Sequence, residues 1–128
     1  MVRRVLVLED DDDLRTLLGE LLGMAGVESC VEAASYDELV RQRAEVLACG
    51  LALLDVNLGA GVASGLDAYR WLRDNGFTGH TVFLTGHARS HPLVRQAHEL
   101  QHVQVLSKPV DAQVLLSLLE DAPSGSHA

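Results

Sequence analysis

The stretch that decides the fold is RVLVLEDDDDL, which runs from Arg4 to Leu14. Its first part is an apolar run that ends at Leu8, and its second part places five carboxylates in a row. A short apolar run bounded by polar residues is typical of a strand that is buried on both faces of a parallel sheet. Carboxylates directly after such a strand favour the start of a helix, because they stabilise its free N–H groups. The stretch therefore predicts a buried strand that leads into a helix.

The same alternation of strand and helix continues along the rest of the chain. Short apolar runs recur between stretches whose apolar residues have the spacing of an amphipathic helix. Strands are predicted at 4–8, 27–33, 51–55, 81–85 and 103–107. Helices are predicted from the apolar faces at 14–22, 36–47, 66–72, 92–100 and 114–119. Strict alternation of five strands and five helices predicts an α/β fold, with a parallel sheet and helices on both faces.

Length and composition limit the classes of protein that fit. The 128 residues suffice for one domain, which we expect to span residues 1–121, while 122–128 lack apolar periodicity and are expected to be a disordered tail or linker. Eighteen acidic against ten basic residues give a net charge of −8, which argues against binding to nucleic acid or to an anionic membrane surface and favours cationic partners or bound cations. The absence of a long apolar run and of a signal peptide predicts a cytoplasmic protein.

Chemically useful side chains stand at the carboxyl ends of the predicted strands. They are Glu9 and Asp10 after the first strand, Asp55 at the end of the third, Thr85 at the end of the fourth, and Lys108, the only lysine, after the fifth. Because ligands bind at this edge of an open parallel sheet, we expect these side chains to meet there. Carboxylates so close together repel each other unless a cation compensates, and oxygen ligands favour Mg²⁺, with Mn²⁺ as an alternative. With a metal bound, an aspartate can act as a nucleophile toward a phosphoryl group.

Four motifs together resemble the receiver domain of two-component response regulators. They are LEDDDDLR, LALLDVN, FLTGHA and VLSKPV, and the resemblance extends over residues 3–121. It implies a flavodoxin-like (βα)5 fold, with a doubly wound, five-stranded parallel sheet in the order 2-1-3-4-5. It also implies that Asp55 is the phosphoacceptor, that Thr85 is the switch hydroxyl, and that Lys108, before a cis peptide bond, contacts the phosphoryl group. The metal ligands that it implies are Glu9, Asp10, Asp55 and the backbone carbonyl of Asn57.

The resemblance further implies a function in signalling. The chain would take a phosphoryl group from a phosphohistidine on a sensor histidine kinase or a histidine phosphotransfer protein, and it would lose this group by hydrolysis. It would not be an enzyme beyond catalysing its own phosphorylation and dephosphorylation. Its output would be contact with a downstream protein or with an output domain missing from this sequence, through a surface around the fourth helix and fifth strand. The chain would be a monomer or a weak homodimer.

The sequence departs from the family pattern at three places, two of which support an alternative function. The loop DVNLGAGVASG, which begins at Asp55, is longer than in most members and lacks their proline. Val105 replaces the tyrosine or phenylalanine that turns inward with the switch threonine, and Gly86 replaces a common alanine, which leaves the site open to water. Because of Val105 and the altered loop, the first alternative is a pseudo-receiver, a binding module that works without phosphorylation. A haloacid-dehalogenase-like phosphatase is a weaker alternative, because EDDDDLR lacks the Gly-Thr that this class carries after its first strand.

The five carboxylates from Glu9 to Asp13 are expected to divide into two groups. Glu9 and Asp10 end the strand and face the site, where a metal ion would account for their crowding. The last three are expected to form the cap and first turn of the following helix. We therefore expect substitution of Asp10 to abolish Mg²⁺ binding and substitution of Asp12 to leave it unchanged.

Overall fold

The computed structural model describes residues 2–59, 61–86, 91–100 and 103–121, and its centre is a parallel sheet of five strands. The strands are β1 (Arg4–Leu8), β2 (Ser29–Ala33), β3 (Leu51–Asp55), β4 (His80–Thr85) and β5 (Val103–Ser107). Their order across the sheet is β2-β1-β3-β4-β5, so the predicted fold class and strand order are confirmed. The predicted tail at 122–128 lies outside the described residues.

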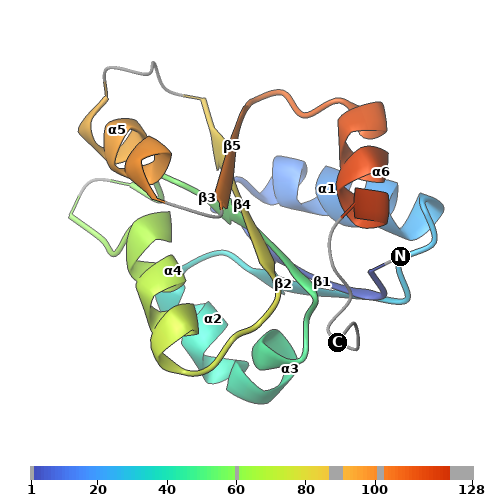
Figure 1. The fold of residues 1–128 in the computed structure, drawn as a ribbon, viewed down its shortest axis with the longest axis horizontal. Coiled ribbons are helices and arrows are strands. Elements are labelled where there is room, and N and C mark those ends of the chain that lie inside the picture. The colour runs from blue at the N-terminus through green and yellow to red at the C-terminus, as the bar shows by residue number, and fades with distance from the viewer. Residues whose placement is uncertain (1, 60, 87–90, 101–102, 122–128) are drawn as a thin grey trace.

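Helices cover both faces of the sheet. They are α1 (Asp12–Met24), α2 (Tyr36–Arg41), α3 (Arg43–Leu47), α4 (Gly65–Asp74), α5 (Pro92–Glu99) and α6 (Ala112–Asp121). Figure 1 shows α1 and α6 on one side of the sheet and α2 to α5 on the other. Within the described residues, no helix has both the length and the apolar character that crossing a membrane requires.

The central strands form the core because their side chains alternate between two apolar layers. In β1, Leu6 and Leu8 pack into the layer under α2 to α5, whereas Val5 and Val7 pack into the layer under α1 and α6. Every residue of β3 is buried, as expected of a central strand in a parallel sheet. Packing on both faces therefore holds the strand ends in a fixed arrangement.

The start of α1 agrees with the prediction for the acidic run. Asp11 is the N-cap, and its side chain accepts a hydrogen bond from the amide of Leu14 at 3.1 Å. Asp12 and Asp13 occupy the first turn, where their charges interact favourably with the helix dipole. The helix ends before Gly26, whose φ of 102° is a conformation that suits glycine.

The prediction of one helix over 36–47 is wrong, because the helix breaks at Gln42 into α2 and α3. The side-chain amide of Gln42 donates to the backbone carbonyl of Glu38 at 3.3 Å and to that of Glu32, in β2, at 2.9 Å. The backbone amide of Gln42 bonds to Leu39 instead of to Glu38, which interrupts the α-helical pattern of hydrogen bonds. The described residues therefore contain six helices rather than the predicted five.

Two strand boundaries also differ slightly from the prediction. β2 begins at Ser29 instead of two residues earlier, and the amides of Glu28 and Ser29 both bond to the carbonyl of Arg3 at this point. β4 begins one residue early, at His80, whose amide bonds to the carbonyl of Gly50. Neither difference moves the carboxyl end of a strand, where the candidate site residues lie.

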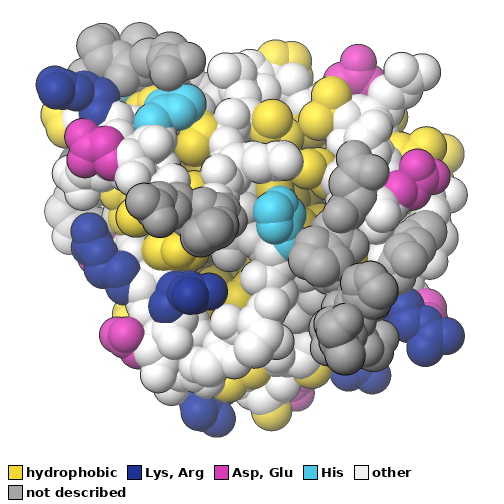
Figure 2. Space-filling view, viewed as in Figure 1, with side chains coloured by type: hydrophobic (Ala, Val, Ile, Leu, Met, Phe, Trp, Pro, Cys, Tyr) yellow, Lys and Arg dark blue, Asp and Glu magenta, His cyan; other side chains and the backbone are white. Residues whose placement is uncertain are grey.

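The surface in Figure 2 carries charged side chains of both signs. The arginine and lysine side chains stand apart on this face, and they form no continuous basic patch in the described residues that are visible there. On this face, the described side chains therefore offer no continuous positive surface to the phosphate backbone of a nucleic acid.

Candidate functional site

The register of the sheet brings the predicted site residues to one edge. Leu8 of β1 pairs with Leu54 of β3, so the residues that follow them, Glu9 and Asp55, lie at the same level on neighbouring strands. Strands β4 and β5 also end level with each other, where Thr85 pairs with the last residue of β5. Because all five strands are parallel, their polar ends gather around the carboxyl end of β3.

An open pocket of about 440 Å³ lies at this edge. Its lining includes Glu9, Asp10, Asp55, Asn57, Gly86 and Lys108. Thr85 is buried at the end of β4, beside Gly86, and is not among the residues that line the pocket. The structure thus brings five of the six predicted site residues around one cavity and places the sixth next to it.

Lys108 joins the two most buried carboxylates of the site. Its Nζ lies 2.6 Å from Oε1 of Glu9 and 3.2 Å from Oδ2 of Asp55. Both acids are buried, with 0% and 3% of their surfaces exposed, so they depend on the ammonium for compensation of their charge. The peptide bond between Lys108 and Pro109 is cis. Because one ammonium serves two buried carboxylates, the pocket keeps a net negative charge.

This excess of negative charge shifts pKa values within the site. Burial, together with the hydrogen bond and charge of Glu9, raises the pKa of Asp55 to about 8, although Lys108 opposes the shift. Partial burial alone would raise the pKa of Asp10, but hydrogen bonds with Glu9 and Asp55 outweigh it, and the pKa is lowered. Burial alone would lower the pKa of Lys108, but Glu9 and Asp55 raise it. Asp55 is therefore the carboxyl group of the site whose pKa burial raises when no further cation is bound.

The carboxylates also fit a divalent metal ion. One oxygen from each of Glu9, Asp10 and Asp55 lies within 4.8 Å of the others. Oε1 of Glu9 is buried and, among the described residues, has no hydrogen-bond partner besides its ion pair with Lys108. Oxygen ligands that carry negative charge are those that Mg²⁺ prefers in proteins. The acidic cluster is therefore compatible with a divalent metal site.

Asn57 and Gly86 lie on the rim of the pocket. The side-chain Oδ1 of Asn57 accepts a hydrogen bond from the amide of Gly59 at 2.9 Å, and the amide of Asn57 donates to Oδ1 of Asp55 at 3.4 Å. These bonds form a tight turn directly after the buried strand. A Cβ added at Gly86 would meet only Cδ of Lys108, at 3.9 Å, so this side of the pocket is open.

Gly65 was not predicted from the sequence as part of the site, although it touches the backbone of Asp55. It is the first residue of α4, and a Cβ there would overlap the carbonyl oxygen of Asp55 and lie 3.2 Å from Cα of Val56. Ser64 caps the helix in a capping box with Asp67, which fixes where α4 begins. The Ser-x-x-Asp spacing could have located this helix start, but only the fold shows which backbone the helix meets.

A family model for the response regulator receiver domain matches residues 5–120 of the chain. The chain belongs to this family. The strand-end aspartate, the acidic pair and the lysine of this receiver domain lie together at the carboxyl edge of the sheet, as the sequence motifs predicted. No match was found among curated proteins.

Several solved structures share the fold of this chain. A response regulator receiver domain protein from Clostridium thermocellum is similar with a TM-score of 0.77 and 21% identity, over 92% of this chain and 91% of that one. A CheY-like receiver domain from Methylobacillus flagellatus has a TM-score of 0.73 and 20% identity, over 94% and 98% of the two chains. A sensor protein from Polaromonas sp. JS666 has a TM-score of 0.73 and 27% identity, over 91% and 92%. These likenesses confirm the fold of the receiver domain.

The receiver domain carries valine, not an aromatic residue, at position 105. Val105 is half-buried in β5 and pairs with Phe83 of β4. The ring of Tyr69, from α4, packs against Phe83 with ring centroids 5.7 Å apart and an angle of 59° between the ring planes. In the described residues, the aromatic contact on this face of β4 therefore comes from α4 and not from β5.

Proposed function

We propose that this receiver domain accepts a phosphoryl group on Asp55 from a phosphohistidine of a sensor histidine kinase or a histidine phosphotransfer protein. The position of Asp55 supports this most, because its carboxyl group is buried at a strand end yet lines an open pocket beside Lys108. Buried charges with a purely structural role are normally matched by their partners. Here one lysine pairs with two buried carboxylates, and the third carboxylate of the cluster, Asp10, lies beside them at the rim, which suits a site that binds a cation and a phosphoryl group.

Each residue has one part in the proposed transfer. An oxygen of Asp55 attacks the phosphorus atom, the P–N bond to the donor imidazole breaks, and the imidazole leaves with the bonding pair. Lys108 contacts Oδ2 of Asp55, so its ammonium is placed to stabilise negative charge on the phosphoryl oxygens. Thr85, at the end of β4, would donate a hydrogen bond from its hydroxyl to the acyl phosphate. Water later attacks the phosphorus, and Asp55 leaves again as a carboxylate.

We propose that Mg²⁺, or Mn²⁺ in its place, is held by Glu9, Asp10, Asp55 and the backbone carbonyl of Asn57. When bound, the ion supplies positive charge that offsets these carboxylates and the oxygens of the phosphoryl group. Asp10 is the exposed member of the cluster, so it can offer an oxygen without breaking a contact with Lys108. Glu9 would be shared between the ion and the lysine.

We propose that the added charge biases an equilibrium between two states of the surface around α5 and β5. This surface would contact a downstream protein or an output domain, and the chain would be a monomer or a weak homodimer. The receiver domain would span residues 1–121 of a cytoplasmic protein. Its catalysis would be limited to its own phosphorylation and dephosphorylation.

Incubation with acetyl phosphate and Mg²⁺ is expected to add the mass of one phosphoryl group to the protein. Asp55→Asn should stay unmodified, because an amide oxygen is a much weaker nucleophile than a carboxylate. Asp13→Asn is a matched control, since Asp13 is an exposed carboxylate in the first turn of α1, and it should be modified like the wild type. Intact-mass spectrometry measures the adduct in all three proteins.

Two results would contradict this proposal. If the wild type and Asp55→Asn are equally unmodified although the protein binds Mg²⁺, the chain is a pseudo-receiver that works without phosphorylation. If the protein turns over p-nitrophenyl phosphate, it is instead a phosphatase of the haloacid-dehalogenase type. The phosphoryl adduct and the turnover of p-nitrophenyl phosphate are measured on the same protein preparation. Together they distinguish a phosphoacceptor receiver from a pseudo-receiver and from a phosphatase.

The variant Asp10→Asn is expected to bind Mg²⁺ at least about tenfold more weakly than the wild type, because it removes one carboxylate from a site for a hard cation. Asp12→Asn should bind Mg²⁺ like the wild type, because Asp12 pairs with Arg15 at 2.5 Å and lies outside the acidic cluster. Isothermal titration calorimetry with Mg²⁺ measures both affinities. Equal affinities of the two variants would exclude Asp10 as a ligand.

A further inference from the structure

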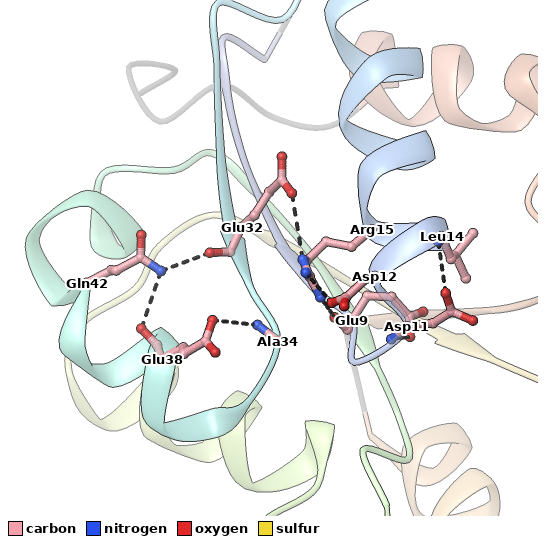
Figure 3. A network of polar contacts seen from close by, with 9 residues as sticks. All are labelled: Glu9, Asp11, Asp12, Leu14, Arg15, Glu32, Ala34, Glu38 and Gln42. Carbon is pink, nitrogen blue, oxygen red and sulfur yellow. Dashed lines mark hydrogen bonds and ion pairs between the residues drawn. The ribbon is translucent and has the colours of Figure 1, made fainter.

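Arg15 lies outside the pocket lining, but its guanidinium contacts the backbone of the buried acid Glu9. Figure 3 shows its side chain reaching from the first turns of α1 back toward the end of β1 and toward β2. Nη1 donates to the backbone carbonyl of Glu9 at 2.8 Å, and Nη2 donates to Oδ1 of Asp12 at 2.5 Å. Nε lies 3.7 Å from Oε1 of Glu32 in β2. Only 17% of the side chain is exposed, so its contacts are largely shielded from water.

Each polar group of Glu9 has its own partner. The amide of Glu9 donates to the carbonyl of Ala33 at 3.0 Å, and its carbonyl accepts from Arg15. Oε2 accepts from the amide of Asp11 at 3.1 Å, and Oε1 pairs with Lys108. Glu9 is therefore tied to β2, to α1 and to the residue that follows β5. Arg15 supplies the bond at the point where β1 turns into α1.

We propose that Arg15 is a positioning residue of the site, which fixes Glu9 and, through Glu9, holds Lys108 in place. Without the guanidinium, the carbonyl of Glu9 loses its donor in a buried residue, and the backbone between β1 and α1 gains freedom to rotate. The carboxylate of Glu9 is then held less firmly at its distance of 2.6 Å from Nζ of Lys108. The planar guanidinium suits this role because its donors point in several fixed directions at once.

A second arginine allows a simpler explanation to be tested, namely that Arg15 only stabilises its own helix. Arg70 pairs with Asp67 in the same i,i+3 arrangement in which Arg15 pairs with Asp12. The side chain of Arg70 is 63% exposed, however, on the surface of α4. Its Nη1 lies 3.4 Å from Oδ1 of Asp67. If Arg15 served only to stabilise its own helix, removing either arginine should have the same small effect.

The single lysine of the sequence gives a direct measurement in metal-free buffer. The rate at which an amine-reactive reagent labels Lys108 is followed in the folded chain by peptide mass spectrometry. We expect Arg15→Gln and Arg15→Met to be labelled roughly tenfold faster than the wild type, as when one charge-assisted hydrogen bond is weakened. Arg70→Gln, which removes the same charge, should be labelled at the wild-type rate.

Circular dichroism first establishes that each variant is folded. Should Arg15→Met fail to fold, Arg15→Gln carries the test, because glutamine keeps a polar end and part of the packing, whereas its shorter side chain ends before the position from which Nη1 donates to Glu9. A wild-type labelling rate in Arg15→Gln would overturn the proposal. An equal acceleration in Arg70→Gln would also overturn it, because the effect would then follow from net charge and not from the bond to Glu9.

The consequence for phosphorylation rests on the proposed function and is measured separately. At Mg²⁺ concentrations below saturation, Arg15→Gln is expected to react with acetyl phosphate about tenfold more slowly than the wild type, whereas Arg70→Gln is not. A wild type that is never phosphorylated would refute the proposed function. The labelling of Lys108 would still decide whether Arg15 positions Glu9, since that measurement needs neither metal nor phosphate.

Discussion

The variant Gly65→Ala is expected to be less stable than the wild type by about 3 kcal/mol or more. A Cβ at Gly65 would overlap the carbonyl oxygen of Asp55 and lie 2.9 Å from its carbonyl carbon. These atoms belong to the backbone of a fully buried strand, so they cannot rotate away as the end of a flexible side chain can. Urea denaturation of the metal-free protein measures the loss in the free energy of unfolding.

The same variant should disturb the candidate site. To relieve the overlap, either α4 or the end of β3 must shift, and the end of β3 carries Asp55. We therefore expect Gly65→Ala to react more slowly with acetyl phosphate even under conditions in which it is fully folded. This second measurement links the stability of the helix start to the position of the proposed phosphoacceptor.

Gly23→Ala is the matched control for Gly65→Ala. Gly23 also lies in a helix, α1, but no atom lies within 4 Å of the position of its added Cβ. Alanine favours the helix more than glycine does, so this variant should gain roughly 0.5–1 kcal/mol. If Gly65→Ala were as stable as Gly23→Ala, the close approach of α4 to β3 would not exist in solution.

The variant Asp55→Asn is expected to be more stable than the wild type near pH 8 in the absence of divalent cations, by roughly 2 kcal/mol. Burial and the neighbouring Glu9 raise the pKa of Asp55 from its ordinary value of 3.8 to about 8 in the folded protein. Between these values the folded protein keeps a proton that the unfolded chain has released, so the stability of the wild type falls as the pH rises from about 4 to about 8. Asparagine has no such proton, so the variant does not suffer this loss.

Chemical denaturation across this pH range tests the expectation. The two proteins should have similar stabilities near pH 4 and should diverge as the pH rises. The expected gain in stability is smaller than the rise in the pKa of Asp55 alone implies, because the substitution also removes a partner of Lys108. Asp13→Asn, which removes an exposed carboxylate, should follow the wild type. A constant difference between wild type and Asp55→Asn at all pH values would mean that Asp55 is ionised throughout and that Lys108 compensates its charge.

Much of the candidate site could be predicted because its residues stand at the ends of recognisable strands. Asp55 follows the most apolar run of the chain, and Lys108 follows the last one. In a parallel sheet such positions meet at one edge whatever the lengths of the loops between them. The pattern therefore predicted which residues approach one another before any distance was known.

Which acid of the pair is buried against Lys108 could not be predicted in this way. Both Glu9 and Asp10 follow β1, but Glu9 is fully buried and pairs with Lys108, whereas Asp10 is exposed at the rim. The break at Gln42 was equally hidden, because the helix is interrupted by a bond from the Gln42 side chain to Glu32 in a separate strand. A local apolar pattern contains no information on such contacts.

The sequence by itself determined the parallel sheet and the edge at which the site lies, because apolar runs mark buried strands and the polar residues that end them share one edge. Only the tertiary structure decided which acids Lys108 contacts, how closely Gly65 approaches Asp55 and which carbonyl accepts a hydrogen bond from Arg15. These contacts depend on where side chains and backbone point once both faces of the sheet are packed. Close packing sets such distances to within a few tenths of an ångström, which no pattern of residue types can specify.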